Sequence, residues 1–207
     1  MSKSPKNTII AFDLHDVIFT FDYKKVAKVL WKWNHKWAII ATLFHPSLVW
    51  QLLKMLWHDA TDEQFYELFE KRRPILMPLI FEMTNAQKLI PGMNVLLKKL
   101  SNKGYELHIL SNIGPRRFEQ LSKDFPEIIS LFKKVKIVQP HGKHSLRKPD
   151  KQFFTDYLKE YKQDHQQIIF VDDKKENINA AQELGIDAIL YKSPKQLQDQ
   201  LVNRNIF

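Results

Sequence analysis

The sequence contains no cysteine and only five glycines among its 207 residues. Without cysteine the chain has no disulfide bond, no catalytic thiolate and no zinc site built on thiolates. Five scattered glycines leave no glycine-rich phosphate loop, which disfavours a P-loop or a dinucleotide-binding fold. Any catalysis therefore depends on other side chains, and the missing thiols are compatible with a reducing, cytoplasmic location.

The sequence also lacks an uninterrupted apolar segment of transmembrane length. The first ten residues, MSKSPKNTII, lack the long apolar stretch of a secretion signal, so we expect a cytoplasmic protein. Residues 37–57 are long enough to span a bilayer, but His45, Pro46 and Lys54 interrupt their apolar run. We expect Pro46 to divide this segment into two buried helices, and we favour that arrangement over contact with a membrane surface.

Acidic residues are outnumbered, with 23 Asp and Glu against 32 Lys and Arg and a net charge of +9. This excess favours anionic partners, of which a small phosphorylated metabolite is the one we expect. Residues 24–37, KKVAKVLWKWNHKW, mix basic and aromatic side chains in a pattern that can also face nucleic acid or lipid. We favour an amphipathic helix here, do not expect nucleic acid as a partner, and rank membrane contact as the weaker alternative.

Five short apolar runs alternate with helical patterns along most of the chain. They are Ile9–Phe12, Leu107–Leu110, Val135–Val138, Ile168–Val171 and Ala188–Tyr191. Short runs that are apolar throughout are typical of strands buried on both faces of a parallel sheet. Their alternation with helices predicts an α/β fold with a doubly wound parallel sheet.

One long segment breaks this alternation. Residues 22–88 contain no convincing strand, hold all five tryptophans, and repeat apolar residues at helical spacing. We therefore predict an all-helical cap at 22–88, inserted into an α/β core that is formed by residues 1–21 and 89–207.

Polar residues follow three of the predicted strands. They are Asp13 after the first run, Ser111 and Asn112 after the second, and Asp172 and Asp173 after the fourth. The carboxyl ends of parallel strands share one edge of the sheet, so we expect these side chains to meet there, with Lys148 of the stretch LRKPD beside them. Carboxylates attract Mg²⁺ and can attack phosphorus, while a lysine and a hydroxyl suit the charge of a phosphate.

Four motifs in this order resemble those of the haloacid dehalogenase-like (HAD) superfamily. They read IIAFDLHDVIF, LHILSN, RKPDKQFF and IIFVDDKKENINAAQELGI. The resemblance covers nearly the whole chain and implies a Rossmann-like core, and the first gap has room for the helical cap of one HAD subclass. Within the superfamily the motifs look closest to bacterial α-D-glucose-1-phosphate phosphatase-like proteins.

The resemblance implies a nucleophile and a Mg²⁺ site. Asp13 would be the nucleophile and one metal ligand. Asp173 would be the main ligand, Asp172 would bind directly or through water, and the backbone carbonyl of His15 would complete the protein's share of the metal shell.

The resemblance also implies a phosphate site. Ser111 and the Asn112 amide would hold a phosphate oxygen, and Lys148 would neutralise Asp13 and the phosphate. His141 and His144 lie near Lys148 in the sequence, where a solvated loop is favoured over substrate contact. The implied function is Mg²⁺-dependent hydrolysis of a small phosphomonoester through an aspartyl-phosphate, and haloalkanoate dehalogenation ranks low.

His15 departs from the family pattern, in which most phosphatases carry an aspartate that acts as general acid and base. Three interpretations stay open. His15 performs the proton transfer, which an imidazole can do near neutral pH; or it contributes only its carbonyl; or the chain is a degenerate member that binds phosphate, a partner or a membrane through its Trp-rich cap. We do not expect Asp16 to substitute, because strand alternation would point it away from Asp13.

Overall fold

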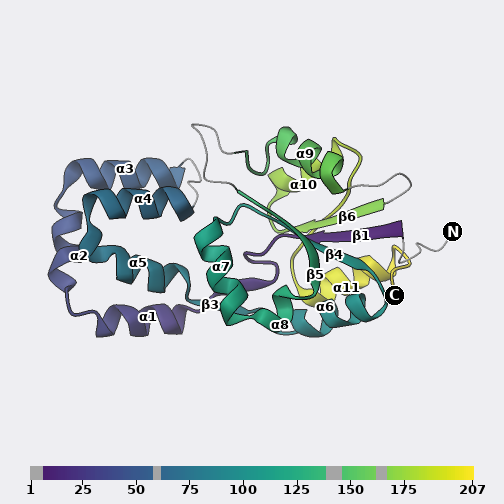
Figure 1. Ribbon diagram of the computed structural model, residues 1–207, viewed down its shortest axis with the longest axis horizontal. Helices are drawn as coiled ribbons and strands as arrows, with labels where there is room; N and C mark the ends of the chain where they lie inside the picture. The colour runs from purple at the N-terminus through teal and green to yellow at the C-terminus, as the bar shows by residue number, and fades with distance from the viewer. Residues whose placement is uncertain (1–6, 58–61, 139–145, 162–166) are drawn as a thin grey trace.

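The computed structural model describes residues 7–57, 62–138, 146–161 and 167–207. Its centre is a parallel sheet of five strands in the order β5-β4-β1-β6-β7 (Figure 1). The strands are β1 (Thr8–Phe12), β4 (Glu106–Ser111), β5 (Phe132–Ile137), β6 (Gln167–Asp172) and β7 (Asp187–Leu190). Each of the five apolar runs coincides with one of these strands, so the predicted α/β fold is confirmed.

The register of the central strand sets the edge at which polar residues gather. All five residues of β1, TIIAF, are buried, as expected for a strand that is covered on both faces. The strand pairs with β4 on one side and β6 on the other, and Phe12 lies level with Ile109 and Val171. The next residues, Asp13 and Asp172, therefore leave the sheet at the same edge.

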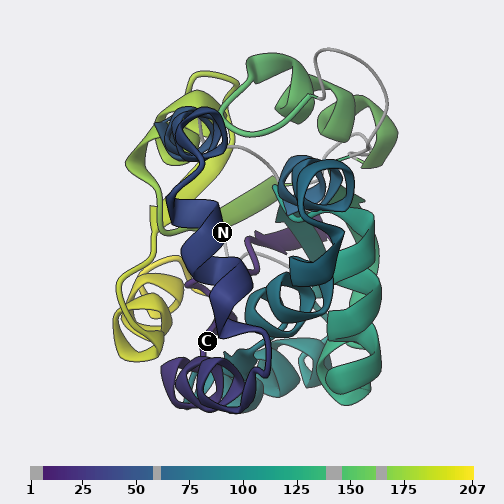
Figure 2. The same cartoon turned by 90° about the vertical axis from the view of Figure 1, so that its left-hand side faces the viewer.

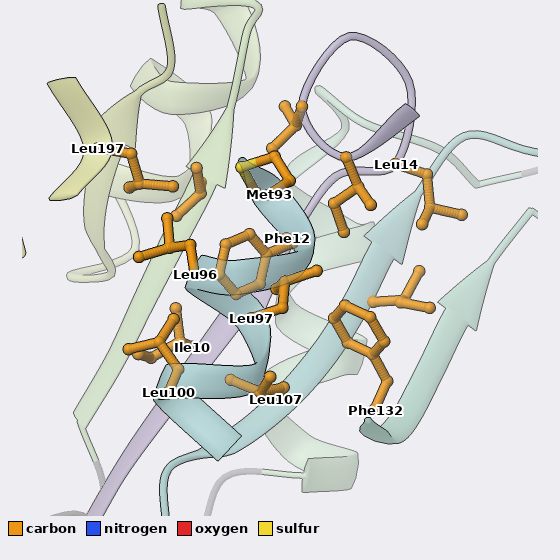
Figure 3. Close-up of a cluster of buried hydrophobic side chains, with 14 of the residues drawn as sticks. Ile10, Phe12, Leu14, Met93, Leu96, Leu97, Leu100, Leu107, Phe132 and Leu197 are labelled. Carbon is orange, nitrogen blue, oxygen red and sulfur yellow. The ribbon is translucent and has the colours of Figure 1, made fainter. Parts of the chain in front are cut away.

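Alternate residues of β1 supply two hydrophobic cores, one on each face of the sheet. Ile10 and Phe12 pack with Leu97 and its neighbours on one face (Figure 3), and Ile9 and Ala11 belong to the core on the other. The helices that follow the strands are α6 (Met93–Asn102), α7 (Pro115–Asp124), α8 (Pro126–Ile129), α9 (Lys151–Tyr161), α10 (Lys175–Gln182) and α11 (Pro194–Val202). Because α9 and α10 cover the face opposite α6 and α11, the doubly wound arrangement is confirmed (Figure 1).

A group of helices forms the end of the molecule beyond the carboxyl edge of the sheet (Figure 1). They are α1 (Tyr23–Lys32), α2 (Lys36–Leu43), α3 (Pro46–Trp57), α4 (Asp62–Arg72), the 3₁₀ turn η2 (Pro74–Leu76) and α5 (Met77–Thr84). As predicted, α2 and α3 divide at Pro46, the first residue of α3. Phe69, Leu76 and Leu79 form a small core of their own between these helices. The helical insertion is confirmed, and we call it the cap.

Two short strands were not predicted. β2 (Phe19–Phe21) and β3 (Gln87–Leu89) pair antiparallel, with Phe21 opposite Gln87, so the chain leaves for the cap and returns from it through this ribbon. The expectation that 22–88 holds no strand is therefore wrong at its final residues. Strands of three residues are too short to carry a periodic pattern, and they form here because the two chain segments meet.

The expectation of two buried helices at 37–57 is wrong for several of its large side chains. Trp37 is 61% exposed and Trp50 is 63% exposed, whereas Ala38 and Leu48 on the same helices are buried. Each helix thus buries one side and presents apolar residues to solvent on the other. Among the described residues, no helix has the length and apolar character needed to cross a membrane.

A buried histidine in β4 gives the core a titratable group. His108 is fully buried; its Nδ1 lies 2.8 Å from the Tyr157 hydroxyl and its Nε2 lies 2.8 Å from a Glu106 carboxylate oxygen. Burial lowers the pKa of His108 below its ordinary value, and Lys134 acts in the same direction, although Glu106 opposes the shift. The folded protein therefore holds this imidazole neutral to lower pH than the unfolded chain does.

We predict that His108 makes the free energy of unfolding fall as the pH drops. Because its pKa is lower in the folded state, the unfolded chain takes up more protons below about pH 6.5, and stability is lost through that window. Urea unfolding of the parent and of His108→Gln between pH 8 and pH 5.5 checks this. The difference in unfolding free energy between the parent and His108→Gln should become smaller as the pH falls. A difference that does not change with pH would contradict the prediction.

Candidate active site

A cavity of about 370 Å³ opens where β1, β4 and β6 end. Six of the residues that the sequence predicted for a site line it, namely Asp13, His15, Ser111, Asn112, Lys148 and Asp173. Asp172 is fully buried behind the lining residues, where it contacts Lys148. The structure thus brings these residues together at one place. His141 and His144 lie outside the described residues.

Lys148 is the positive centre of this cluster. Its side chain is 1% exposed, and its Nζ lies 2.6 Å from an Asp172 oxygen and 3.1 Å from an Asp13 oxygen. Burial alone would lower the pKa of Lys148, but the charges of Asp13 and Asp172 outweigh it and raise the pKa above its ordinary value. The ammonium group therefore stays charged between two carboxylates.

The Asn112 side chain positions Lys148 through the backbone. Its Nδ2 donates to the Lys148 carbonyl at 2.8 Å, and its Oδ1 accepts from the Lys148 N–H at 2.8 Å. Two hydrogen bonds between one amide and one residue fix the direction in which the lysine enters the site. The side chain of Asn112 is thus engaged within the protein, which was not foreseen from the sequence.

Both carboxylate oxygens of Asp172 accept hydrogen bonds. Its Oδ2 accepts from Lys148, while its Oδ1 accepts from the Lys174 N–H at 2.8 Å and from Asn177 Nδ2 at 2.9 Å. Burial raises the pKa of this carboxyl above its ordinary value, and the charge of Asp13 adds to that shift, although Lys148 and the Lys174 N–H act to lower the pKa. The three donors thus oppose the effect of burial. These contacts suit Asp172 to holding Lys148 more than to direct coordination of a metal.

Three carboxylates of the cluster are close enough to share a cation. One oxygen from each of Asp13, Asp172 and Asp173 can be chosen so that all lie within 4.8 Å of one another. Burial, followed by the negative charges of Asp172 and Asp13, raises the pKa of Asp173 to about 6. That repulsion is what a hard divalent cation relieves, and oxygen donors are the ones Mg²⁺ prefers. The residues present therefore fit Mg²⁺, with Asp13 and Asp173 as the carboxylates best placed to touch it.

The loop after β1 places His15 and Asp16 side by side. His15 Nε2 lies 3.4 Å from Asp16 Oδ2, and Asp16 Oδ1 accepts a hydrogen bond from the Thr20 hydroxyl at 2.7 Å. Asp16 has a φ of 54°, in the left-handed region, so strand alternation no longer holds there. Both side chains line the cavity. The expectation that Asp16 points away from the site is therefore wrong, because the chain leaves the strand after Phe12.

The family model of haloacid dehalogenase-like hydrolases matches residues 51–191 of this chain. The chain belongs to this family. The pocket of this family member has an aspartate after the first strand and a buried lysine beside an acidic pair.

Two curated relatives are fungal and match only in part. A drimenol cyclase from Aspergillus calidoustus is 33% identical over 107 residues, which are 52% of this chain and 20% of that protein. A sesquiterpene phosphatase from Aspergillus oryzae is 35% identical over 94 residues, which are 45% of this chain and 46% of that protein. The matched regions thus span less than half of each relative's length.

Solved structures of HAD enzymes share the fold. A HAD-family enzyme from Bacteroides thetaiotaomicron superposes with a TM-score of 0.62 at 20% identity, over 90% of this chain and 94% of that one. The same enzyme has been crystallised with magnesium and inorganic phosphate. An L-2-haloacid dehalogenase from Xanthobacter autotrophicus superposes with a TM-score of 0.57 at 17% identity, over 96% and 84% of the two chains. At these identities the likeness concerns the fold.

Several pocket residues of this HAD-like hydrolase gave no signal in the sequence. Arg117 of α7 is almost fully buried at the cavity wall, and its guanidinium lies 5.3 Å from the centre of the Phe21 ring. Gln87, in the returning strand β3, also lines the cavity. An arginine on a helix and a glutamine near a cap boundary are common surface residues, so only the fold assigns them to the site.

An ion-pair cluster joins the cap to the core beside this site. Arg116 donates from its backbone N–H and its Nε to the two oxygens of Glu63 in α4, at 3.0 and 2.6 Å. Its Nη1 also donates to Glu70 at 2.5 Å. Gly114 permits the contact, because a Cβ there would lie 2.6 Å from the Glu63 Cγ. The cap is thus fastened to the start of α7.

Proposed function

We propose that this HAD-like hydrolase is a Mg²⁺-dependent phosphatase that cleaves a small phosphomonoester through an aspartyl-phosphate on Asp13. The observation that carries the proposal is the buried Lys148, whose ammonium group bridges Asp13 and Asp172 at the wall of a cavity that Asp173 also lines. A phosphate carries the negative charge that a cation and a lysine stabilise, whereas the carbon–halogen bond of a haloalkanoate has no such charge for them to stabilise.

Each residue of the cluster then has a distinct task. Asp13 attacks phosphorus, so that a carboxylate–phosphorus bond forms while the bond to the alcohol oxygen breaks. Lys148 and the Ser111 hydroxyl stabilise the charge on the phosphoryl oxygens, together with the backbone N–H of Asn112, because the side chain of Asn112 is engaged with Lys148. Water then attacks the aspartyl-phosphate and restores Asp13.

Mg²⁺ would be held by Asp13, Asp173 and the carbonyl of His15, with Asp172 acting through Lys148 or a water. When bound, it would neutralise charge on the phosphate and reduce the repulsion between Asp13 and the incoming anion.

The metal requirement provides the direct test of the proposal. We expect phosphate release from a generic aryl phosphate to need Mg²⁺, to stop with excess EDTA and to return when Mg²⁺ is restored. The measurement is a colorimetric assay of inorganic phosphate at several metal concentrations. Release that is indifferent to EDTA contradicts a metal-dependent mechanism. Tight binding of inorganic phosphate and Mg²⁺ without turnover of any substrate supports the degenerate binding protein instead.

We further propose His15 as the group that protonates the leaving oxygen and later activates water. It lines the cavity and lies beside Asp16, whose carboxylate can orient the ring. We expect His15→Ala to lower the rate by about 100-fold, within the range of general acid–base contributions, and His15→Asp to restore much of it. Steady-state kinetics with a substrate of poor leaving group measures this. Equal rates for the parent and His15→Ala would mean that the imidazole takes no part and that His15 contributes only its backbone carbonyl.

For the substrate we favour the monophosphate of an apolar alcohol such as an isoprenoid. Leu14, Phe19 and Ile113 contribute apolar wall to the cavity, and one relative carries the name sesquiterpene phosphatase. The resemblance to α-D-glucose-1-phosphate phosphatase-like proteins favours a sugar phosphate instead and stays a prediction. Comparing kcat/KM for farnesyl monophosphate and α-D-glucose-1-phosphate separates the two.

A further inference from the structure

The outer end of the cap exposes an unusual number of large apolar side chains. They come from α1, α2, the α2–α3 junction and α3, and they are Trp31, Trp37, Ile40, Phe44, Trp50 and Leu53. Trp31 is 80% exposed and Phe44 is 82% exposed. Single exposed apolar residues are ordinary, but a gathering of this size marks a contact surface. We call these six residues the Trp face.

Helix α2 shows most clearly how apolar this exposed surface is. Trp37, Ile40 and Phe44 follow at intervals of three and four and so share one side of the helix, which is exposed, whereas Ala38 and Thr42 are buried on the other. A surface helix normally turns polar residues to water on the side away from the core. The outer side of α2 is as apolar as its inner side, so water is a poor environment for it.

The three helices present these residues at the same end of the molecule. Figure 2 shows α2 crossing the end of the cap, with α1 at one of its ends and α3 at the other. Side chains join the α1–α2 corner, where Lys36 Nζ lies 5.1 Å from the centre of the Trp31 ring. His35 continues the contact, with its ring centre 5.9 Å from that of Trp33 and 6.3 Å from that of Trp37.

The charge of the segment that carries the Trp face has one sign. Residues 23–57 contain six lysines and no aspartate or glutamate. Five of the lysines are exposed on α1 and α2, namely Lys24, Lys25, Lys28, Lys32 and Lys36. A second copy of this chain would bring the same positive charges together, which disfavours self-association. The surface complements an anionic partner that also accepts tryptophan and aliphatic side chains.

We propose that the Trp face docks on the surface of an anionic membrane. Tryptophan rings partition to the headgroup level of a bilayer, and lysines beside them are attracted to acidic lipids. The cap would lie on the membrane and not cross it. None of the residues that line the active-site cavity belongs to α1, α2 or α3, so the docking surface is separate from the catalytic one.

Vesicle flotation tests the proposal with the whole chain. We expect the parent protein to float with vesicles of phosphatidylcholine and phosphatidylserine, to bind pure phosphatidylcholine more weakly, and to lose affinity as salt is raised. Binding should also shift the tryptophan emission to shorter wavelength, because the exposed rings leave water.

Matched variants distinguish binding through the Trp face from nonspecific apolar adsorption and from an effect of net charge. We expect Trp37→Ser with Phe44→Ser, and separately Lys24→Glu with Lys28→Glu and Lys32→Glu, to lower affinity for the anionic vesicles by about tenfold or more. The apolar control is Val95→Ser with Val202→Ser, which alters exposed residues of the core helices α6 and α11.

The charge control is placed on the core and changes the net charge by the same amount. It combines Lys98→Glu, Lys133→Glu and Lys195→Glu, three exposed core lysines. Both controls should bind as the parent does, and every variant should keep the parent's circular dichroism spectrum. Three outcomes overturn the proposal: no flotation with anionic vesicles, an equal loss in the core variants, or a Trp37-dependent dimer in light scattering without vesicle binding.

Discussion

Asp13→Asn is expected to reduce phosphate release by at least about 10⁴-fold, because an amide oxygen is a far weaker nucleophile than a carboxylate and nucleophile removal costs of this order. The exchange is isosteric, so the backbone bond from the Asp13 N–H to the Val171 carbonyl at 2.9 Å can remain. The measurement is kcat/KM for an aryl phosphate, combined with mass spectrometry of the protein after rapid quenching. The parent should carry a transient phosphoryl group and Asp13→Asn should carry none.

The matched control for Asp13→Asn is an aspartate outside the cavity. Asp199 is exposed on α11, and Asp199→Asn removes the same charge from the chain without touching the cavity. It should leave the rate unchanged. Residual activity of Asp13→Asn within about tenfold of the parent would assign the nucleophile to another residue or to water, since such a loss is too small for a covalent step.

The sheet and the convergence of distant residues were predictable because both depend on strong, regular signals. A strand buried on two faces leaves a continuous apolar run, and Asp13, Ser111 and Asp172 end or follow such runs. Parallel pairing then fixes that they meet at one edge. No comparable strand-end rule places Lys148, which enters the site from a loop; the stretch LRKPD suggested it, and the resemblance to a family gave it a role.

Other features were decided by tertiary contacts that leave little trace in the sequence. The left-handed φ of Asp16 turns its side chain back to His15, and an Asp in a loop gives no warning of this conformation. The two hydrogen bonds between the Asn112 side chain and the backbone of Lys148 were not foreseen, because nothing in the sequence pairs these residues. The helices at 37–57 were expected to be buried because of their apolar run, but Trp37 and Trp50 are exposed, since an apolar side chain is buried only where another surface covers it.

Lys148→Met is expected to cost both catalysis and stability. Its ammonium group is the buried cation between Asp13 and Asp172, and methionine has similar length but no charge. Without it Asp172, which is fully buried, loses its ion-pair partner, and breaking a buried pair from one side costs about 3 kcal/mol or more. We expect a loss of that order in urea unfolding without Mg²⁺, and a fall in the rate of about 100-fold or more from the missing charge stabilisation.

The double variant Lys148→Met with Asp172→Asn separates the two effects. Removing the charge of Asp172 should restore much of the unfolding free energy, because this fully buried side chain then carries no unpaired charge, and Lys174 and Asn177 can still donate to the amide oxygen. Activity should stay low, since no ammonium group returns to the cavity. If activity recovered together with stability, Lys148 would serve the fold alone, and the phosphate would be held without it.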